Sequence, residues 1–507
     1  MKNRINRRDF LKLAGLLTPS LAAPRVLQTL DRHLQEKPRN IVVVLFDALS
    51  ACNISRYGYE RRTTPNIDRL SKRAVVYHNH FAGGNFTTPG TASLLTGVLP
   101  WTHRAFQPNA EVAEAFLSRN IFSLFPDHYR IAYTHNGWAY TLLRQFRDGI
   151  DELIAREKLM LGVFDRAVQE LFTNDGDISS VGWIRGMKIR EEGYAYSLFL
   201  SHLYENLQEK EFEQLLPFFP RGIPTAGPDS GFMLETAIDT TEKRLSEIPG
   251  PFVGYFHFLP PHSPYRTRRE FYQALKGDGY NPVEKPIDIF AREADKDMLP
   301  RRTAYDEFIL YCDREFGRLY DRLEASGLLE DTWLVLTSDH GEMNERGISG
   351  HMTNALYQPV VRIPLMIFEP GRQAGVDVRE YTSAVDVLPT LLHLARRTIP
   401  DWIEGVVLPP FVPANRIPDR NVYLMRANNN EKYAPLTEAS TMLVRDGYKL
   451  HYHFGYRQLP EEGLVRLFDI KSDPEELVDL YPSKRGIASE LLNELKNKLD
   501  EVNQPYL

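Results

Sequence analysis

The sequence is poor in cysteine, in long apolar segments and in net positive charge, and each shortage excludes a class of protein. Its 507 residues include 2 cysteines, Cys52 and Cys312, so a disulfide framework is excluded, although one bridge between them stays open. The formal net charge of -6 does not favour binding to nucleic acid. Neither the short apolar run near the N-terminus nor any segment after it is long and apolar enough to span a bilayer. A chain of this length can still bury a large core, as one big domain or two unequal ones.

The N-terminus carries a targeting pattern that begins with Arg7 and Arg8. A short apolar run follows and leads to the small residues of 20–23. This pattern is typical of a twin-arginine signal peptide over 1–23, with 24–38 as a linker. A basic amphipathic arm is the alternative. We expect export in the folded state by the twin-arginine machinery, to the periplasm or outside the cell.

Two apolar strands predicted from the sequence end in acidic or histidine residues. The first strand runs from Asn40 to Asp47, and the second, which begins at Trp333, ends on Asp339 and His340. Function collects at the carboxyl ends of strands in α/β sheets. Oxygen and nitrogen donors that meet there are suited to a divalent metal ion.

The stretch from Asn85 to Gly97 has a polar front and an apolar back. Pro89-Gly90 is expected to break the incoming strand, and Thr91 to cap a short helix. The hydroxyl of Thr87 or Thr88 would then lie ahead of a helix N-terminus, where an anion is favoured. A hydroxyl nucleophile that faces a phosphate or sulfate would use this geometry. An ordinary loop-to-helix transition is the alternative.

Six segments together resemble the sulfatase branch of the alkaline-phosphatase superfamily, in the order that this family has. They span nearly the whole chain after the signal region, and they lie at 40–47, 63–70, 87–97, 261–265, 337–342 and 350–353. The resemblance implies an α/β fold with a large central mixed β-sheet flanked by helices, as in alkaline phosphatase, over 39–408. A helical insertion is expected at 138–248. A small C-terminal α+β subdomain with an antiparallel sheet is expected over 409–507.

The resemblance also assigns residues to a site. It implies one divalent metal ion, Mn, Mg, Ca or Zn, held by four residues: Asp47, Thr87, Asp339 and His340. His262 and His351 match histidines that contact the substrate, and a histidine can protonate a departing alkoxide near neutral pH. His103 is a weaker candidate for substrate binding. His257 lies within a strand and is interpreted as structural.

The sequence departs from the family pattern at its nucleophile. Formylglycine sulfatases carry Cys or Ser at the position of Thr87, with Arg four residues later, where this chain has Thr91. Threonine cannot be oxidised to formylglycine, so that cofactor is not expected. The segment 52–56, Cys-Asn-Ile-Ser-Arg, partly mimics the Cys-x-Pro-Ser-Arg motif that is modified to formylglycine in those sulfatases, but it lacks the proline. Ala48 replaces the usual second carboxylate beside Asp47, which weakens a calcium site.

These observations predict a metal-dependent hydrolase of phosphoric esters, phosphodiesters or phosphonate monoesters, with Thr87 as the nucleophile. Three alternatives stay open. They are a sulfuric ester hydrolase, a phosphoglycerol- or phosphoethanolamine-type transferase, and a non-catalytic relative that binds an anionic ester. The substrate is expected to be a small-molecule, lipid or glycan ester. The sequence indicates neither its leaving group nor an oligomeric state.

Overall fold

The computed structural model describes residues 38–161, 210, 213–227, 230–291, 298–412 and 420–507. The expected signal peptide at 1–23, nearly all of the linker and 162–209 of the helical insertion lie outside the described residues. Export through the twin-arginine machinery therefore stays a prediction. The distribution of contacts between residues divides the chain into two units, Met1–Arg39 and Asn40–Leu507. The boundary expected at 408/409 also stays a prediction.

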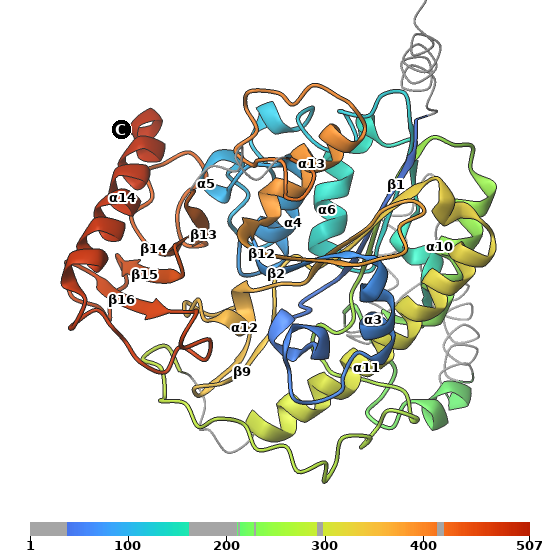
Figure 1. The fold of residues 1–507 in the computed structure, drawn as a ribbon, viewed down its shortest axis with the longest axis horizontal. Helices are drawn as coiled ribbons and strands as arrows, with labels where there is room; N and C mark the ends of the chain where they lie inside the picture. Colours follow the sequence, from blue (N-terminus) through green and yellow to red (C-terminus); the bar gives the residue numbers. More distant parts are fainter. Residues whose placement is uncertain (1–37, 162–209, 211–212, 228–229, 292–297, 413–419) are drawn as a thin grey trace, which may run out of the picture. The chain divides into compact units, whose positions relative to one another are not determined.

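A mixed sheet of eight strands is the centre of the Asn40–Leu507 unit in the described part of the chain (Figure 1). Its order is β12-β2-β11-β8-β1-β7-β3-β4. The strands pair in parallel except at β11, which is antiparallel to both of its neighbours. The strands are β1 (Asn40–Phe46), β2 (Val75–Phe81), β3 (Tyr129–Thr134), β4 (Glu152–Leu153), β7 (Phe252–Phe258), β8 (Thr332–Thr337), β11 (Leu365–Phe368) and β12 (Val376–Ser383). The predicted α/β class with a large mixed sheet is confirmed.

Helices cover both faces of this sheet, and β1 shows why its sequence is a continuous apolar run. Ile41, Val43 and Leu45 pack into the core on one face, whereas Val42, Val44 and Phe46 pack into the core on the other. A strand buried on both faces needs apolar side chains at every position. The first face is covered by α4 (Thr87–Thr96), α6 (Gly137–Gln145) and α13 (Val387–Leu394), and the second by α3 (Pro65–Leu70), α10 (Leu234–Glu247) and α11 (Met298–Ala325).

The segment 63–70 docks helix α3 onto α11. Asp313 of α11 accepts hydrogen bonds from the backbone N–H groups of Asn66 and Ile67 at 2.9 and 2.8 Å. These groups belong to the first turn of α3, where backbone donors have no partner within the helix. A carboxylate at this end is also favoured by the helix dipole. This segment therefore has a structural part in the fold.

The C-terminal region forms a second, antiparallel sheet with one long helix beside it (Figure 1). Leu491, Leu495 and Leu499 of α14 (Arg485–Asn503) pack into the same core as this sheet. The expected C-terminal α+β arrangement is confirmed. Its strands are β13 (Val422–Arg426), β14 (Ala439–Arg445), β15 (Tyr448–Phe454) and β16 (Leu464–Asp469).

The remaining α-helices and β-strands that lie wholly within the described residues are short, and they are β5 (Met160–Leu161), β6 (Gly231–Phe232), β9 (Met343–Glu345), β10 (Ile348–Gly350), α5 (Pro100–His103) and α12 (Gln358–Val361). Cys52 and Cys312 are both free thiols. In the segments that the structure describes, no helix has both the length and the apolarity of a membrane span.

Helix α4 begins earlier than its sequence predicts. Its first residue is Thr87, and Phe86 is the N-cap. The expectation that Pro89-Gly90 breaks the chain and that Thr91 caps the helix is therefore wrong. Proline is tolerated in the first turn, because its missing N–H would have no partner within the helix there. As a result, Thr87 itself lies at the N-terminus of α4.

Gly90 lets α4 approach the end of β8 closely. A Cβ atom built on Gly90 would lie 2.2 Å from the carbonyl oxygen of Asp339. Backbone atoms cannot tolerate that distance, so a larger residue must push the helix and the strand end apart. The close contact fixes the position of Thr87 relative to Asp339.

We expect Gly90→Ala to lower the free energy of unfolding by about 1–3 kcal/mol, because overpacking shifts backbone as well as side chains. Gly486→Ala is the matched control, since a Cβ atom added to Gly486 in α14 would have no other atom within 4 Å. Urea unfolding of both variants measures the effect. Equal stability of the two variants would show that the close approach at Gly90 does not constrain the helix.

Candidate functional site

The candidate site lies where adjacent parallel strands of the sheet end. Asp47 directly follows β1, and Asp339 follows its neighbour β8 after one residue. On the other side of β1, His257 is the last residue but one of β7 and pairs with Leu45. Asn136 follows β3, the next strand in the sheet, and α4 presents Thr87. Segments far apart in the chain thus contribute to one centre.

Three buried residues of this centre lie close enough together that they could hold a metal ion. Asp47, Asp339 and His340 each offer one ligand atom, and these atoms lie within 4.8 Å of one another. His340 Nε2 is 3.4 Å from Asp47 Oδ1 and 3.6 Å from Asp339 Oδ2. Thr87 Oγ1 lies 3.4 Å from the same nitrogen. The structure therefore brings together all four residues that the resemblance assigned to the metal.

The donors at this centre fit a divalent cation. Asp47 Oδ1 is buried and faces His340 Nε2, with no hydrogen-bond partner among the described residues. His340 Nδ1 donates to the carbonyl oxygen of Gly341 at 2.9 Å, which orients the ring so that Nε2 points to the carboxylates. Two carboxylates, an imidazole and a hydroxyl are ordinary ligands of such an ion. A bound ion would lower the pKa of the Thr87 hydroxyl and polarise an ester oxygen.

Burial and charge strongly shift the pKa values of two candidate ligands, Asp47 and His340. Burial alone would raise the pKa of Asp47, but the charge of His262 and the interactions with His257 and His340 hold it well below its usual value. For His340, burial lowers the pKa, yet the charges of Asp339 and Asp47 outweigh this and raise it to about 9. The metal-free centre therefore retains a proton on His340 at neutral pH.

Metal binding is expected to depend on pH, because the ion must displace that proton. The folded-state pKa of His340, about 9, exceeds the ordinary 6.5. The proton therefore stabilises the metal-free protein below about pH 6.5, and this contribution is lost as the pH rises through about 9. We expect apparent metal affinity to rise by about tenfold per pH unit from neutral pH up to about 9. Calorimetry in buffers of different ionisation enthalpy measures the released proton. An affinity that does not change over this range would contradict the assignment.

His262 and His351 lie beside the candidate metal ligands with their rings oriented by the protein. Their ring centroids are 4.8 Å apart, and that of His351 is 4.2 Å from His340. His351 Nδ1 donates to Glu342 Oε2 at 3.0 Å, and His262 Nδ1 donates to the carbonyl oxygen of Ser263 at 2.6 Å. Each ring therefore keeps Nε2 for a substrate, which suits the predicted proton transfer.

His103 does not join this cluster. Its Nδ1 accepts a hydrogen bond from the Ala105 N–H at 3.0 Å, and its Nε2 donates to Ser93 Oγ at 3.1 Å. The side chain is fully buried, and burial lowers its pKa to about 3. Because both ring nitrogens are used inside the protein, the structure corrects the interpretation of His103 as a substrate-binding residue.

Two residues at the centre were not recognised from the sequence. Asn136 Nδ2 donates to Asp47 Oδ2 at 2.6 Å and to Thr87 Oγ1 at 3.2 Å. His257, which was interpreted as structural, has Nε2 only 3.1 Å from Asp47 Oδ2. A histidine within an otherwise apolar strand was the available signal for the second residue. Asn136 also caps α6. Because helix capping alone accounts for an asparagine at this position, the sequence did not indicate the contact with Asp47.

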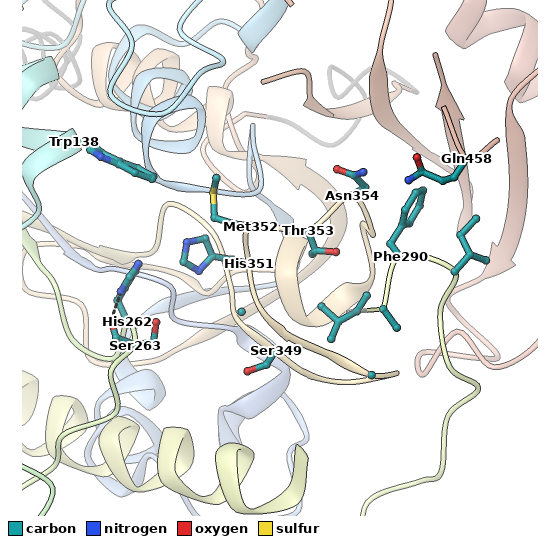
Figure 2. A pocket seen from close by; sticks show the side chains of 15 residues that line it. Trp138, His262, Ser263, Phe290, Ser349, His351, Met352, Thr353, Asn354 and Gln458 are labelled. Atoms are coloured by element: carbon teal, nitrogen blue, oxygen red, sulfur yellow. Dashed lines mark hydrogen bonds between the residues drawn. The ribbon is translucent and has the colours of Figure 1, made fainter. Parts of the chain in front are cut away.

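The centre opens into two adjoining cavities. Thr87, Asn136 and Arg266 line one of about 460 Å³. Trp138, His262 and Ser263 line both this cavity and a second one of about 590 Å³. Figure 2 shows Trp138, His262 and His351 at one end of the second cavity, with Phe290, Asn354 and Gln458 at the other. A substrate can therefore place its reacting group at Thr87 and extend past His351.

Comparison with known proteins gives consistent matches. The sulfatase family model matches residues 39–397, and the model of the N-sulphoglucosamine sulphohydrolase C-terminal region matches 351–505. A choline-sulfatase from Rhizobium meliloti (strain 1021) is 26% identical over 475 residues, 88% of this chain and 83% of that protein. An ulvan-active sulfatase from Formosa agariphila is 25% identical over 501 residues, 95% of this chain and 84% of that protein. The crystal structure of a phosphonate monoester hydrolase of Agrobacterium radiobacter has a TM-score of 0.64 at 16% identity, covering 92% of this chain and 96% of that chain.

Proposed function

This chain belongs to the sulfatase family of the alkaline-phosphatase superfamily, and from that membership and the geometry of its site we propose that it hydrolyses phosphoric esters with Thr87 as nucleophile. It is a sulfatase-family hydrolase, and its expected substrates are phosphodiesters or phosphonate monoesters. The observation that carries this proposal is the position of a threonine hydroxyl among the metal ligands. Thr87 Oγ1 lies 3.4 Å from His340 Nε2 and accepts a hydrogen bond from Asn136 at 3.2 Å.

The chemistry of threonine favours direct attack on phosphorus. Its secondary hydroxyl cannot be converted to the aldehyde on which formylglycine enzymes depend, so the oxygen itself must form the covalent bond. The Thr87 hydroxyl releases its proton to solvent water, and attack of its oxygen on phosphorus forms a phosphothreonine and breaks the bond to the departing alcohol. Nε2 of His262 or His351 donates the proton that this alcohol oxygen needs, and for this the ring must carry a proton on both nitrogens, because each Nδ1 already donates to the protein. Water then attacks the phosphothreonine, releases the product and restores the hydroxyl.

The charge of the site favours a substrate with one negative charge. Among the described residues that line the Thr87 cavity, Arg266 is the single side chain with a permanent positive charge. The two buried carboxylates offset the charge of a divalent ion, so little positive charge is left to compensate a dianion. Phosphodiesters and phosphonate monoesters are monoanions at neutral pH, whereas a phosphate monoester carries close to two negative charges.

Sulfuric ester hydrolysis is the second candidate. The choline-sulfatase and the ulvan-active sulfatase are named for sulfate esters, and a sulfate monoester is also a monoanion. A transferase of the phosphoglycerol or phosphoethanolamine type would use the same covalent step with an alcohol in place of water. A panel of bis-p-nitrophenyl phosphate, a phosphonate monoester and p-nitrophenyl sulfate, each with and without alcohol acceptors, separates these reactions. Turnover of the sulfate alone would refute the phosphoric ester proposal.

We expect Thr87→Ala to lower kcat by about a thousandfold or more, because it removes the atom that forms the covalent bond. Thr87→Ser keeps the hydroxyl and should retain part of the activity. Thr88→Ala is the matched control, since Thr88 Oγ1 accepts a hydrogen bond from the Asn109 N–H at 3.1 Å and should change kcat by less than about threefold. Asp339→Asn should reduce metal content and turnover together.

Steady-state kinetics and metal analysis of these four variants decide the assignment. Full activity in Thr87→Ala, or a larger loss in Thr88→Ala, would place the nucleophile elsewhere. Normal metal binding by the protein with no turnover of any ester would favour the non-catalytic alternative.

We also propose that the alcohol part of the substrate is a neutral, hydroxyl-rich group such as a sugar. Among the described residues that line the second cavity, none is Asp, Glu, Lys or Arg. Aromatic rings at its two ends, Trp138 and Phe290, offer flat apolar faces (Figure 2). The neutral side chains of Asn354 and Gln458 lie near Phe290 and can bond hydroxyl groups. Apolar faces beside a few polar groups are typical of small-molecule sites.

Phe290→Ala should raise KM for a glycan ester by about 5- to 30-fold, since stacking and burial of an aromatic ring contribute about 1–2 kcal/mol. It should leave KM for a small aryl ester unchanged, because Phe290 lies at the cavity end away from His262 (Figure 2). Tyr433→Ala is the matched control, as Tyr433 is 60% exposed. Equal effects of Phe290→Ala on both esters, or faster turnover of choline esters than glycan esters, would contradict a sugar at this position.

A further inference from the structure

The two oxygens of the Asp47 carboxylate have different surroundings. Oδ2 accepts a hydrogen bond from Asn136 Nδ2 at 2.6 Å and lies 3.1 Å from His257 Nε2. Oδ1 faces His340 Nε2 at 3.4 Å and has no hydrogen-bond partner among the described residues. One oxygen is therefore held by the protein, and the other is directed at the candidate metal position.

The two oxygens of the Asp339 carboxylate also have different surroundings. Asp339 Oδ1 accepts hydrogen bonds from the backbone N–H groups of Ala48 at 3.3 Å and His340 at 3.0 Å. Oδ2 lies 3.6 Å from His340 Nε2, with the Thr91 hydroxyl at 3.5 Å. Each carboxylate can thus present a single oxygen to an ion without losing its hydrogen bonds.

The proton positions on His257 follow from its two partners. An ionised carboxylate only accepts hydrogen bonds, so His257 Nε2 must carry the proton that faces Asp47. In the neutral ring Nδ1 is then an acceptor, and the Tyr255 hydroxyl, 3.1 Å away, donates to it. Tyr255 and His257 are fully buried on β7. The shorter contact of His257 Nε2 is with Asp47 Oδ2 at 3.1 Å, and Asp339 Oδ2 lies farther away at 3.9 Å.

From these contacts we propose that His257, supported by Tyr255, is a positioning residue that holds Asp47 as a one-oxygen ligand and thereby makes the centre selective for a first-row transition-metal ion over calcium. Calcium takes six to eight oxygen ligands, often with a carboxylate bound through both oxygens. The donors at this centre are one oxygen from each carboxylate, an imidazole nitrogen and the Thr87 hydroxyl. This small set with nitrogen suits zinc or manganese. The inference deepens the proposed function by naming the class of ion.

The test is metal binding without substrate, so its outcome does not depend on which ester the protein hydrolyses. Zn²⁺, Mn²⁺ and Ca²⁺ affinities are measured by competition titration, and Co²⁺ loading is followed by visible absorption. Wild type should bind Zn²⁺ and Mn²⁺ at least about a hundredfold tighter than Ca²⁺. Its Co²⁺ form should show the intense absorption of a four- or five-coordinate ion. Tighter binding of Ca²⁺ would overturn the proposal.

Three substitutions separate positioning from general packing. His257→Leu should weaken Zn²⁺ binding by about 10- to 100-fold, with a smaller change for Ca²⁺ and a weaker Co²⁺ band. His257→Gln keeps an N–H donor and should restore most of the affinity. Tyr255→Phe removes a single hydroxyl and should show a smaller loss in the same direction, which provides a readout if His257→Leu does not fold.

His80→Leu is the matched control, because His80 is also a fully buried histidine of the central sheet, where its Nδ1 contacts Thr382. This change should leave metal preference unaltered. Unchanged metal affinity and Co²⁺ spectrum in both His257→Leu and Tyr255→Phe would refute the positioning role. A Gln variant no better than the Leu variant would also refute it, since it would show that the ring rather than the hydrogen bond is required.

Discussion

Two carboxylates buried together in the core are the constraint on which the rest of the site depends. Asp47 and Asp339 are both 0% exposed, and isolated charges in such surroundings are very costly. The protein compensates them with hydrogen bonds, from Asn136 and His257 to one carboxylate and from backbone N–H groups to the other. The proton on His340 supplies positive charge in the absence of an ion. A bound divalent cation would complete this compensation.

The fold places these groups through strand order and close packing. Strands β8, β1 and β7 are neighbours and parallel, so the residues at their carboxyl ends meet without long loops. Gly90 allows the first turn of α4 to contact Asp339, which places Thr87 at the edge of the cluster. The buried charges at this centre therefore affect both stability and chemistry, since those of Asp339 and Asp47 raise the pKa of His340 to about 9.

The fold was implied by the resemblance of six segments to a known family, and part of this centre was predictable from local sequence, because apolar runs mark buried strands and their last residues mark the sheet edge. Asp47 and Asp339 are examples. The contact of His257 with Asp47 depends on the register between β1 and β7, which one strand alone does not reveal. The edge strand β12 was missed because several of its side chains are polar and exposed. The start of α4 was misplaced because Pro89-Gly90 signals a break in sequence, yet it fits the first helical turn.

The proposed hydrolysis depends on a covalent bond between the Thr87 oxygen and the reacting centre. The most direct measurement is rapid acid quench of the metal-loaded enzyme during turnover of a slow phosphodiester, followed by tandem mass spectrometry of the peptide that contains residues 85–97. We expect the mass of the transferred phosphoryl group on Thr87, at a level that rises and falls with the pre-steady-state burst. Turnover with the phosphoryl group on another residue, or with none on Thr87 at any quench time, would contradict it.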